Sequence, residues 1–324
     1  MILVTGGTGY VGTVLVPLLA QRYPVRVYCN MAFGNAIEGT PNVEFIKGDL
    51  RDTQLMQFAL RGVHQVVHLA GIVTSELVAM NEALSQQINV DAMAVLVRQA
   101  RAANVHRFVY ASSSSVYGFC EKPATEEMVP KPMDAYAQTK LDGEEALKRE
   151  AGAMEWAILR SATLCGPAPR MRLDTIVNVF CKQAWFNGKI TVFDGRQWRS
   201  NVHVRDAAEG YVWLLEQPEE KVNHAVFNLT VANMRALDIA RLVQQAVEFG
   251  YERKALIAVD TEKIDRRHYQ LDAARMRQAG FAPRHSIREA VFDTCDWFQA
   301  GGVREPDADV YSNTKRMATF MKES

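Results

Sequence analysis

A glycine-rich loop close to the first residue constrains the fold more than any other part of the sequence. The apolar, strand-like segment Ile2–Thr5 leads straight into the run 6–12 (GGTGYVG), and a helical pattern follows as far as about Arg22. Glycines at positions 6, 9 and 12 permit a tight turn and let backbone N–H groups approach a pyrophosphate at the N-terminus of the helix. Because the loop lies between a strand and a helix, as a dinucleotide-binding fingerprint requires, we predict that the chain binds a dinucleotide.

Strands and helices alternate regularly through the first half of the chain. Strand-like apolar runs recur at 25–29, 43–46, 63–70, 107–112 and 156–160, and helical patterns lie between them at about 52–61, 78–103 and 134–150. This alternation predicts an α/β, Rossmann-like fold, in which a doubly wound parallel sheet carries helices on both faces.

The pattern loosens after a Gly-Pro turn at 166–167. Helices are expected at about 172–186, 205–216, 236–249, 270–279 and 287–300, with short strands at 190–193, 201–204 and 225–229. We therefore expect residues 1–166 to form a dinucleotide-binding domain and residues 167–324 to form mainly a smaller C-terminal substrate-binding lobe and tail. Segments at about 201–230 are expected to return to the first domain.

Composition narrows the class of protein. The 324 residues include 37 basic and 37 acidic side chains, so no basic surface for nucleic acid is indicated. The five cysteines and seven histidines are scattered, which predicts neither a metal site nor a disulfide framework. No segment approaches the roughly 18 apolar residues of a membrane span, and no basic start precedes an apolar signal sequence. We expect a cytoplasmic protein with no membrane or nucleic-acid partner.

The end of the second predicted strand leaves the choice of dinucleotide open. In NAD-binding units an acidic residue usually stands there and binds the adenosine ribose hydroxyls. This chain has Cys29 and Asn30 at that point, and no Arg or Lys follows closely to receive the 2′-phosphate of NADP. Asn30 can hydrogen-bond a ribose hydroxyl, so NAD is expected and NADP is not excluded.

Two segments carry residues suited to proton transfer. Tyr136 and Lys140 lie one helical turn apart, and an ammonium near a phenol favours the phenolate, lowering a pKa that is ordinarily about 10. A tyrosine tuned in this way can take a proton from an alcohol or return one to a carbonyl. The serine run 112–115 follows the fifth strand, where a hydroxyl can donate to a substrate oxygen. Taken alone, the Tyr–Lys spacing is more typical of an amphipathic surface pair than of a catalytic one, and Asn89 receives no catalytic role from its spacing.

Seven segments in register resemble the extended short-chain dehydrogenase/reductase family, in its nucleotide-sugar epimerase/dehydratase branch. The segments are TGGTGYVG at 5–12, GDLRD at 48–52, HLAG at 68–71, YASSSSVYG at 110–118, YAQTK at 136–140, LRSATLCGP at 159–167 and NVHVRDAAEGY at 201–211. Together they cover most of the chain in the family's order. The resemblance implies an enzyme that uses NAD(P) on a nucleotide sugar.

The resemblance also assigns roles to individual positions. It implies that Ser113, Tyr136 and Lys140 are catalytic, with Lys140 also near the nicotinamide ribose. The cofactor-binding positions that we expect, with Tyr136 and Lys140 counted again, are Gly6, Gly9, Tyr10, Val11, Gly12, Asn30, Asp49, Leu50, Leu69, Ala70 and Gly71. The substrate-binding positions that we expect are Thr74, Ser114, Ser115, Thr163, Arg199 and Arg267.

Departures from the family pattern affect the predicted reaction. Ser114 and Ser115 stand where sugar 4,6-dehydratases carry an Asp-Glu pair, so dehydration loses its acid and base. Thr163 and Cys165 replace an Asn and a Tyr on the substrate side, and specificity cannot be transferred. We expect a 4-epimerase-type reaction with Tyr136 as the acid and base. An NADPH-dependent keto-sugar reductase is the alternative, and a non-catalytic dinucleotide-binding sensor or scaffold is an alternative of another class.

Association is expected from the resemblance alone. Extended members of the family often dimerise through two long helices, here at about 79–103 and 134–150, which predicts a homodimer. The polar tail after the glycines at 301–302 is expected to pack loosely or to cross to a partner.

Overall fold

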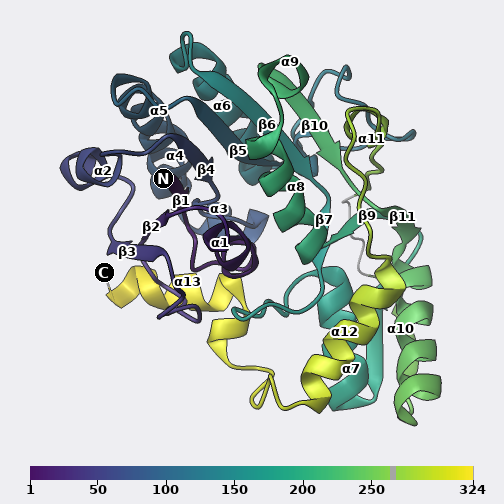
Figure 1. Cartoon of the computed structure of the whole chain (residues 1–324). Coiled ribbons are helices and arrows are strands. Elements are labelled where there is room, and N and C mark those ends of the chain that lie inside the picture. Colours follow the sequence, from purple (N-terminus) through teal and green to yellow (C-terminus); the bar gives the residue numbers. More distant parts are fainter. Residues whose placement is uncertain (263–267, 324) are drawn as a thin grey trace.

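The computed structural model describes residues 1–262 and 268–323 and shows a mixed α/β protein built on one large parallel sheet (Figure 1). The sheet has seven strands in the order β10-β6-β5-β4-β1-β2-β3. Their bounds are β1 (Ile2–Thr5), β2 (Val25–Cys29), β3 (Val43–Lys47), β4 (Gln65–His68), β5 (Arg107–Ser113), β6 (Glu155–Ser161) and β10 (Ala225–Leu229). Every neighbouring pair is parallel, which confirms the predicted Rossmann-like class.

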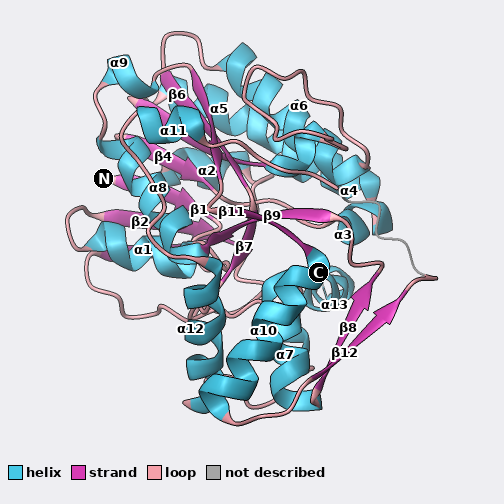
Figure 2. Ribbon diagram, turned by 90° about the vertical axis from the view of Figure 1, so that its right-hand side faces the viewer, coloured by secondary structure: helices cyan, strands magenta, loops and turns pink. Residues whose placement is uncertain are grey.

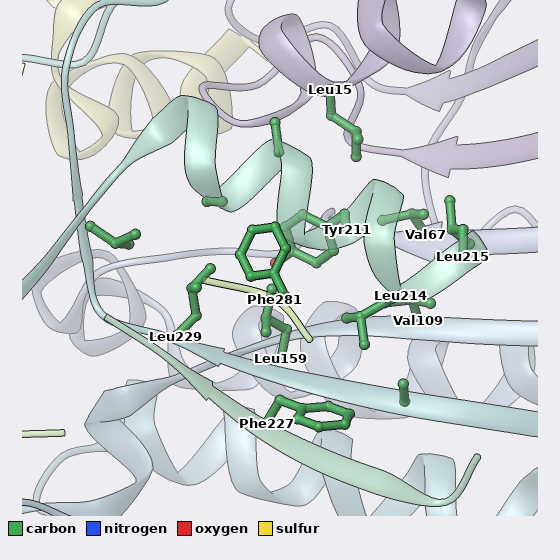
Figure 3. Close-up of a cluster of buried hydrophobic side chains, with 14 of the residues drawn as sticks. Leu15, Val67, Val109, Leu159, Tyr211, Leu214, Leu215, Phe227, Leu229 and Phe281 are labelled. Atoms are coloured by element: carbon green, nitrogen blue, oxygen red, sulfur yellow. The ribbon is translucent and has the colours of Figure 1, made fainter. Parts of the chain in front are cut away.

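Adjacent residues of the central strands enter different hydrophobic cores. Val67, Val109 and Leu159 pack on one face of the sheet, against α1 (Gly12–Ala20) and α8 (Val204–Glu216), as Figure 3 shows for the labelled side chains. The residues just before them, Val66, Phe108 and Ile158, belong to the cluster on the other face, with α2 (Thr53–Ala59), α5 (Ala92–Ala102) and α6 (Ala135–Glu150). Burial on both faces explains why these strands read as unbroken apolar runs.

A smaller helical lobe stands beyond the carboxyl ends of the strands (Figure 2). Its core packs α7 (Ile176–Asn187), α10 (Ala236–Tyr251) and α12 (Ile287–Gln299) together, beside the parallel pair β8 (Lys189–Phe193) and β12 (Leu256–Asp260). A three-stranded sheet of β7 (Thr163–Cys165), β9 (Trp198–His203) and β11 (Ala232–Arg235) joins this lobe to the main body. The short helices α9 (Glu219–Val222) and α11 (Ala274–Gln278) contact β6 and β10, respectively.

The helix expected over 78–103 is wrong as a single element. The structure has α3 (Ser75–Met80), α4 (Glu82–Gln86), a π-helical turn over 87–91 and then α5. The break falls at Asn81, whose extended backbone (φ −155°, ψ 82°) ends α3 and whose side chain accepts a hydrogen bond from Leu84 N at 3.0 Å. An asparagine that caps the next helix competes with continuation of the previous one.

The tail also differs from expectation, because it forms a helix that packs on its own chain. Helix α13 (Asn313–Glu323) contacts α3 and lies beside the loop that follows β2, as Figure 1 shows in yellow and purple. Met317 joins the apolar cluster of Ile72 and Leu77, and Arg316 Nε donates to the carbonyl oxygen of Ala32 at 2.6 Å. None of the helices in the described ranges is long and apolar enough to cross a membrane.

Candidate active site

A cavity of about 630 Å³ lies between the carboxyl ends of the sheet strands and the smaller lobe. This volume falls within the range usual for small-molecule sites. All the site residues predicted above line this cavity, except Arg267, which lies outside the described residues. The sheet order reverses between β1 and β4, so the cavity occupies the crevice where open α/β sheets bind their ligands.

The glycine loop follows β1 and forms a cradle that side chains would fill. Gly6 has a φ of +71°, and a Cβ placed on it would lie 2.8 Å from the backbone nitrogen of Ala70. A Cβ on Gly12 would lie 2.4 Å from the carbonyl oxygen of Gly7. The loop backbone therefore approaches both the end of β4 and the first turn of α1 as closely as a pyrophosphate cradle requires. These residues fit the phosphate groups of a dinucleotide.

The adenosine side of the cradle has a different polar chemistry from a usual NAD site. Cys29 Sγ lies 3.2 Å from Thr8 Oγ1, and Asn30 Oδ1 accepts a hydrogen bond from Ala32 N at 3.1 Å. Asp49 is engaged by Arg51, whose Nε and Nη2 lie 2.9 and 2.8 Å from its oxygens. The hydrogen bond from Arg51 is the main cause that lowers the pKa of Asp49, so a charged carboxylate stands where the resemblance implies a contact with adenine.

Ser113 and Tyr136 meet at the end of β5. Ser113 Oγ accepts hydrogen bonds from the backbone nitrogen of Ser115 at 3.2 Å and from Ser115 Oγ at 2.9 Å. Its own proton is thus free for Tyr136, with which it shares a hydrogen bond. Asp134 fixes the start of α6 by accepting from Ala137 N at 2.8 Å, and so presents Tyr136 in the first turn of that helix.

The pKa of Tyr136 is raised in this structure, opposite to the direction expected from the sequence. Burial is the largest cause, and the hydrogen bond from Ser113 and the charge of Arg172 oppose it. Lys140 does not act as expected because its ammonium is directed elsewhere: Nζ donates to the carbonyl oxygen of Ala111 at 2.9 Å and lies over the ring of Tyr110. Burial lowers the pKa of Lys140 to about 8, although the charge of Glu144 acts in the other direction.

Asn89 has a positioning role that its spacing did not reveal. Its Oδ1 accepts from Ile72 N at 2.7 Å, and its Nδ2 donates to Ile72 O at 2.8 Å and to Thr139 Oγ1 at 3.1 Å. The π-helical turn presents this side chain to the segment after β4. Asn89 therefore fixes Gly71 and Ile72 against α6, next to Lys140.

A buried ion pair connects helix α6 to the sheet. Glu144, four residues after Lys140, is fully buried and accepts from Arg160 Nε at 2.9 Å and Nη2 at 2.6 Å. Ser112 Oγ donates to the same carboxylate at 2.5 Å, and Arg160 Nη1 donates to Tyr117 Oη at 2.9 Å. This network connects β5, β6 and α6. The only sequence signal for this network was Glu144 itself, a charged residue on the same face of the predicted helix as Lys140.

The smaller lobe closes the far side of the cavity. Arg199 on β9 is buried, and its guanidinium lies over the ring of Tyr269 at 5.7 Å. The hydroxyl of Tyr269 lies 3.3 Å from Thr163 Oγ1. Cavity-lining residues to which the sequence prediction assigned no role include Phe33, Arg170, Arg172, Thr175, Gln197, Tyr269 and Asn313. Most of them lie in loops, and Asn313 begins α13, so no periodic pattern marks them.

Comparison with known proteins places the chain among enzymes. A model of the NAD dependent epimerase/dehydratase family matches residues 2–230. The chain belongs to this family. Membership confirms the resemblance noted in the sequence, and the family's dependence on NAD confirms the expected cofactor.

Individual members of the family cover nearly the whole chain. A putative UDP-glucose 4-epimerase of Methanocaldococcus jannaschii is 28% identical over 92% of this chain and 98% of its own. The solved UDP-glucose 4-epimerase of Thermotoga maritima with UDP-glucose has a TM-score of 0.82 at 25% identity, covering 93% of this chain and 99% of its own. MoeE5 in complex with UDP-glucose and NAD has a TM-score of 0.81 at 25% identity over the same shares of the two chains.

Proposed function

We propose that this family member converts a nucleotide sugar by a 4-epimerase-type reaction, with Tyr136 as the acid and base. The observation that carries the proposal is the joint placement of Ser113, Tyr136 and Lys140 in one cavity with the glycine cradle. Arg199, on the opposite wall, is the cation proposed to bind the diphosphate of the substrate. The relatives named as UDP-glucose 4-epimerases support the substrate class.

The chain's own residues divide into those that hold the cofactor and those that move a proton. The cradle of Gly6, Gly9 and Gly12 would hold the pyrophosphate, and Ala70 and Gly71 leave room for the cofactor at the end of β4. When bound, NAD supplies a nicotinamide that accepts and returns a hydride.

Tyr136 is well placed to exchange a proton with a sugar oxygen. Its raised pKa means that the phenol carries its proton at neutral pH, so in this state it is ready to donate one. Once the proton has left, the hydrogen bond from Ser113 stabilises the phenolate, which can then take a proton from a hydroxyl. Lys140 adds a positive charge one helical turn away, at a pKa of about 8.

The carboxylates around the cavity favour epimerisation over dehydration. Among the described residues, those that line the cavity are Asp49, Glu76, Asp134 and Asp174. Asp49 is held by Arg51, Asp134 caps α6 and Asp174 is paired with Arg172, while Glu76 is exposed at the rim. Among the described residues, no unengaged Asp-Glu pair of the kind that dehydration uses thus accompanies Tyr136. Epimerisation through a ketone needs none.

Replacement of Tyr136 tests the proposal. We predict that Tyr136→Phe lowers turnover of the active nucleotide sugar by about a hundred- to ten-thousandfold, because the group that transfers the proton is lost. The amount of NAD bound per protein should stay unchanged. Tyr251→Phe, outside the cavity, removes a hydroxyl bound to Asp296 and serves as the control.

The substrate and cofactor screens decide between the reactions. Wild-type protein is incubated with UDP-, GDP-, CDP- and dTDP-sugars, and the sugar products are separated by chromatography. Interconversion of 4-epimers with retained NAD supports the proposal. Near-full turnover by Tyr136→Phe refutes the assigned role, and consumption of added NADPH with a keto-sugar indicates a reductase instead.

A further inference from the structure

Arg170 is a buried cation without a partner carboxylate. Only 4% of the residue is exposed, and its Nε forms no hydrogen bond with any described residue. No carboxylate in the described ranges lies within ion-pair distance, since the neighbouring Asp174 is bound by Arg172 and by the backbone nitrogen of Asn313. A buried charge of this kind destabilises a fold unless something pairs with it.

The position of Arg170 indicates which ligand would pair with it. The residue lines the cavity, and its backbone nitrogen lies 3.3 Å from Thr13 Oγ1, in the first turn of α1. Its guanidinium stacks on the ring of Phe33 at 3.7 Å, in the loop that follows β2. Arg170 thus stands between the helix N-terminus that follows the glycine cradle and the loop beside the adenosine ribose position.

The C-terminal helix fixes the orientation of this guanidinium. Arg170 Nη2 donates to Asn313 Oδ1 at 2.6 Å, and Asn313 is the first residue of α13. The same helix is tied to the loop after β2 through Arg316, which donates to Ala32 O at 2.6 Å. An amide oxygen orients the guanidinium without neutralising its charge. The guanidinium of Arg170 therefore keeps its positive charge for a phosphate group.

We propose that Arg170, oriented by Asn313, binds a phosphate group of the dinucleotide. The proposal rests on the dinucleotide part of the proposed function and adds a ligand from the smaller lobe to the glycine cradle. Its chemistry is recognition of phosphate oxygens by a guanidinium, which fits either the pyrophosphate of NAD or the 2′-phosphate of NADP. The lowering of the pKa of Arg170 to about 9, chiefly by burial and then by Arg172, agrees with a cation that lacks a counter-charge.

Binding of cofactor fragments tests the proposal without reference to turnover. The chain of 324 residues, freed of bound nucleotide, is titrated calorimetrically with NAD, NADP, ADP, 2′-AMP, adenosine and UDP. We expect Arg170→Met to weaken the phosphate-containing ligand that it contacts by about ten- to a hundredfold and to leave adenosine unchanged. Weaker NAD and ADP identify the pyrophosphate, and weaker NADP and 2′-AMP alone identify the 2′-phosphate. Lys182→Met, which removes a cation that pairs with Asp307 and lies off the cavity wall, is the control.

A second variant keeps the proposal open to refutation if Arg170→Met does not fold. Asn313→Asp places a carboxylate on Arg170 Nη2 and gives the guanidinium an internal partner. We expect it to raise the melting temperature of the cofactor-free protein and to weaken the same ligands as Arg170→Met. Unchanged affinity for every phosphate ligand in a folded variant, or a loss confined to UDP, overturns the proposal. Failure of the wild type to bind NAD or NADP refutes the proposed function instead, so the two failures are distinguishable.

Discussion

Lys140 is a buried cation of the candidate active site. The free energy that its burial costs can be measured from the pH dependence of unfolding. The side chain is 4% exposed, and burial lowers the pKa of its ammonium from 10.5 to about 8. A lysine with a lowered folded-state pKa destabilises the fold wherever the ammonium is charged, and this cost fades as the pH rises from 8 towards 10.5. With those two values the cost is about 3 kcal/mol at pH 7 and about 1 kcal/mol at pH 9.5.

Replacing Lys140 by Met removes the charge while keeping much of the apolar volume. We predict that the free energy of unfolding of Lys140→Met, minus that of wild type, falls by about 2 kcal/mol between pH 7 and pH 9.5. The hydrogen bond to Ala111 O contributes an offset, but the change with pH belongs to the ionisation. Urea unfolding of the cofactor-free proteins, followed by tryptophan fluorescence at both pH values, measures this difference.

A lysine on the exposed side of the same helix provides the control. Lys148 pairs with Glu145 three residues away and is exposed, so Lys148→Met should give a difference that does not change with pH over this range. A difference for Lys140→Met that is equally constant would refute the reasoning. It would mean that the ammonium is solvated in the folded protein and does not carry the burial cost.

Two further substitutions test the supports of the site. Gly6→Ala should abolish detectable NAD binding by calorimetry and lower the melting temperature, because its Cβ would lie 2.8 Å from the backbone of Ala70 at a φ of +71°. Retained NAD affinity would show that the loop moves aside. Glu144→Gln should destabilise the protein by about 3–5 kcal/mol in urea unfolding, since Arg160 stays buried with its charge unpaired. A loss below 1 kcal/mol, like that of an exposed pair, would contradict this.

The sheet and its cradle could be predicted because their signals are local. The strand, glycine turn and helix at 2–20 follow one another in sequence, and the apolar runs that form the other central strands are buried on both faces. The same alternation predicted which strand ends meet, and so brought Ser113, Tyr136 and the cradle to one edge. In a parallel sheet the carboxyl ends of all the strands lie along one edge, so residues that follow different strands are close in space.

Predictions failed where individual side-chain contacts, either local or between distant segments, decide the outcome. A helix pattern over 78–103 could not reveal that Asn81 caps a new helix or that Asn89 is held by Ile72. The polar residues of α13 hid the few apolar ones that pack on α3. The expected effect of Lys140 on the pKa of Tyr136 was wrong for a related reason. Lys140 Nζ donates its hydrogen bond to Ala111 O, which belongs to another element, β5.

Two of the buried cations that line the cavity, Lys140 and Arg170, link the stability of the fold to ligand binding in the cavity. Lys140 lies on α6 and Arg170 belongs to the smaller lobe, and burial lowers the pKa of each. Each of these cations destabilises the ligand-free protein. Binding of a ligand that places negative charge near them is therefore favoured, because it removes part of the free energy lost by burying the charge. A ligand at a hundred times its dissociation constant stabilises a protein by about 3 kcal/mol, which is comparable to the cost at Lys140 alone. Stabilisation by a bound cofactor would suit the proposed epimerisation, in which the hydride returns to the same sugar and the cofactor stays in place.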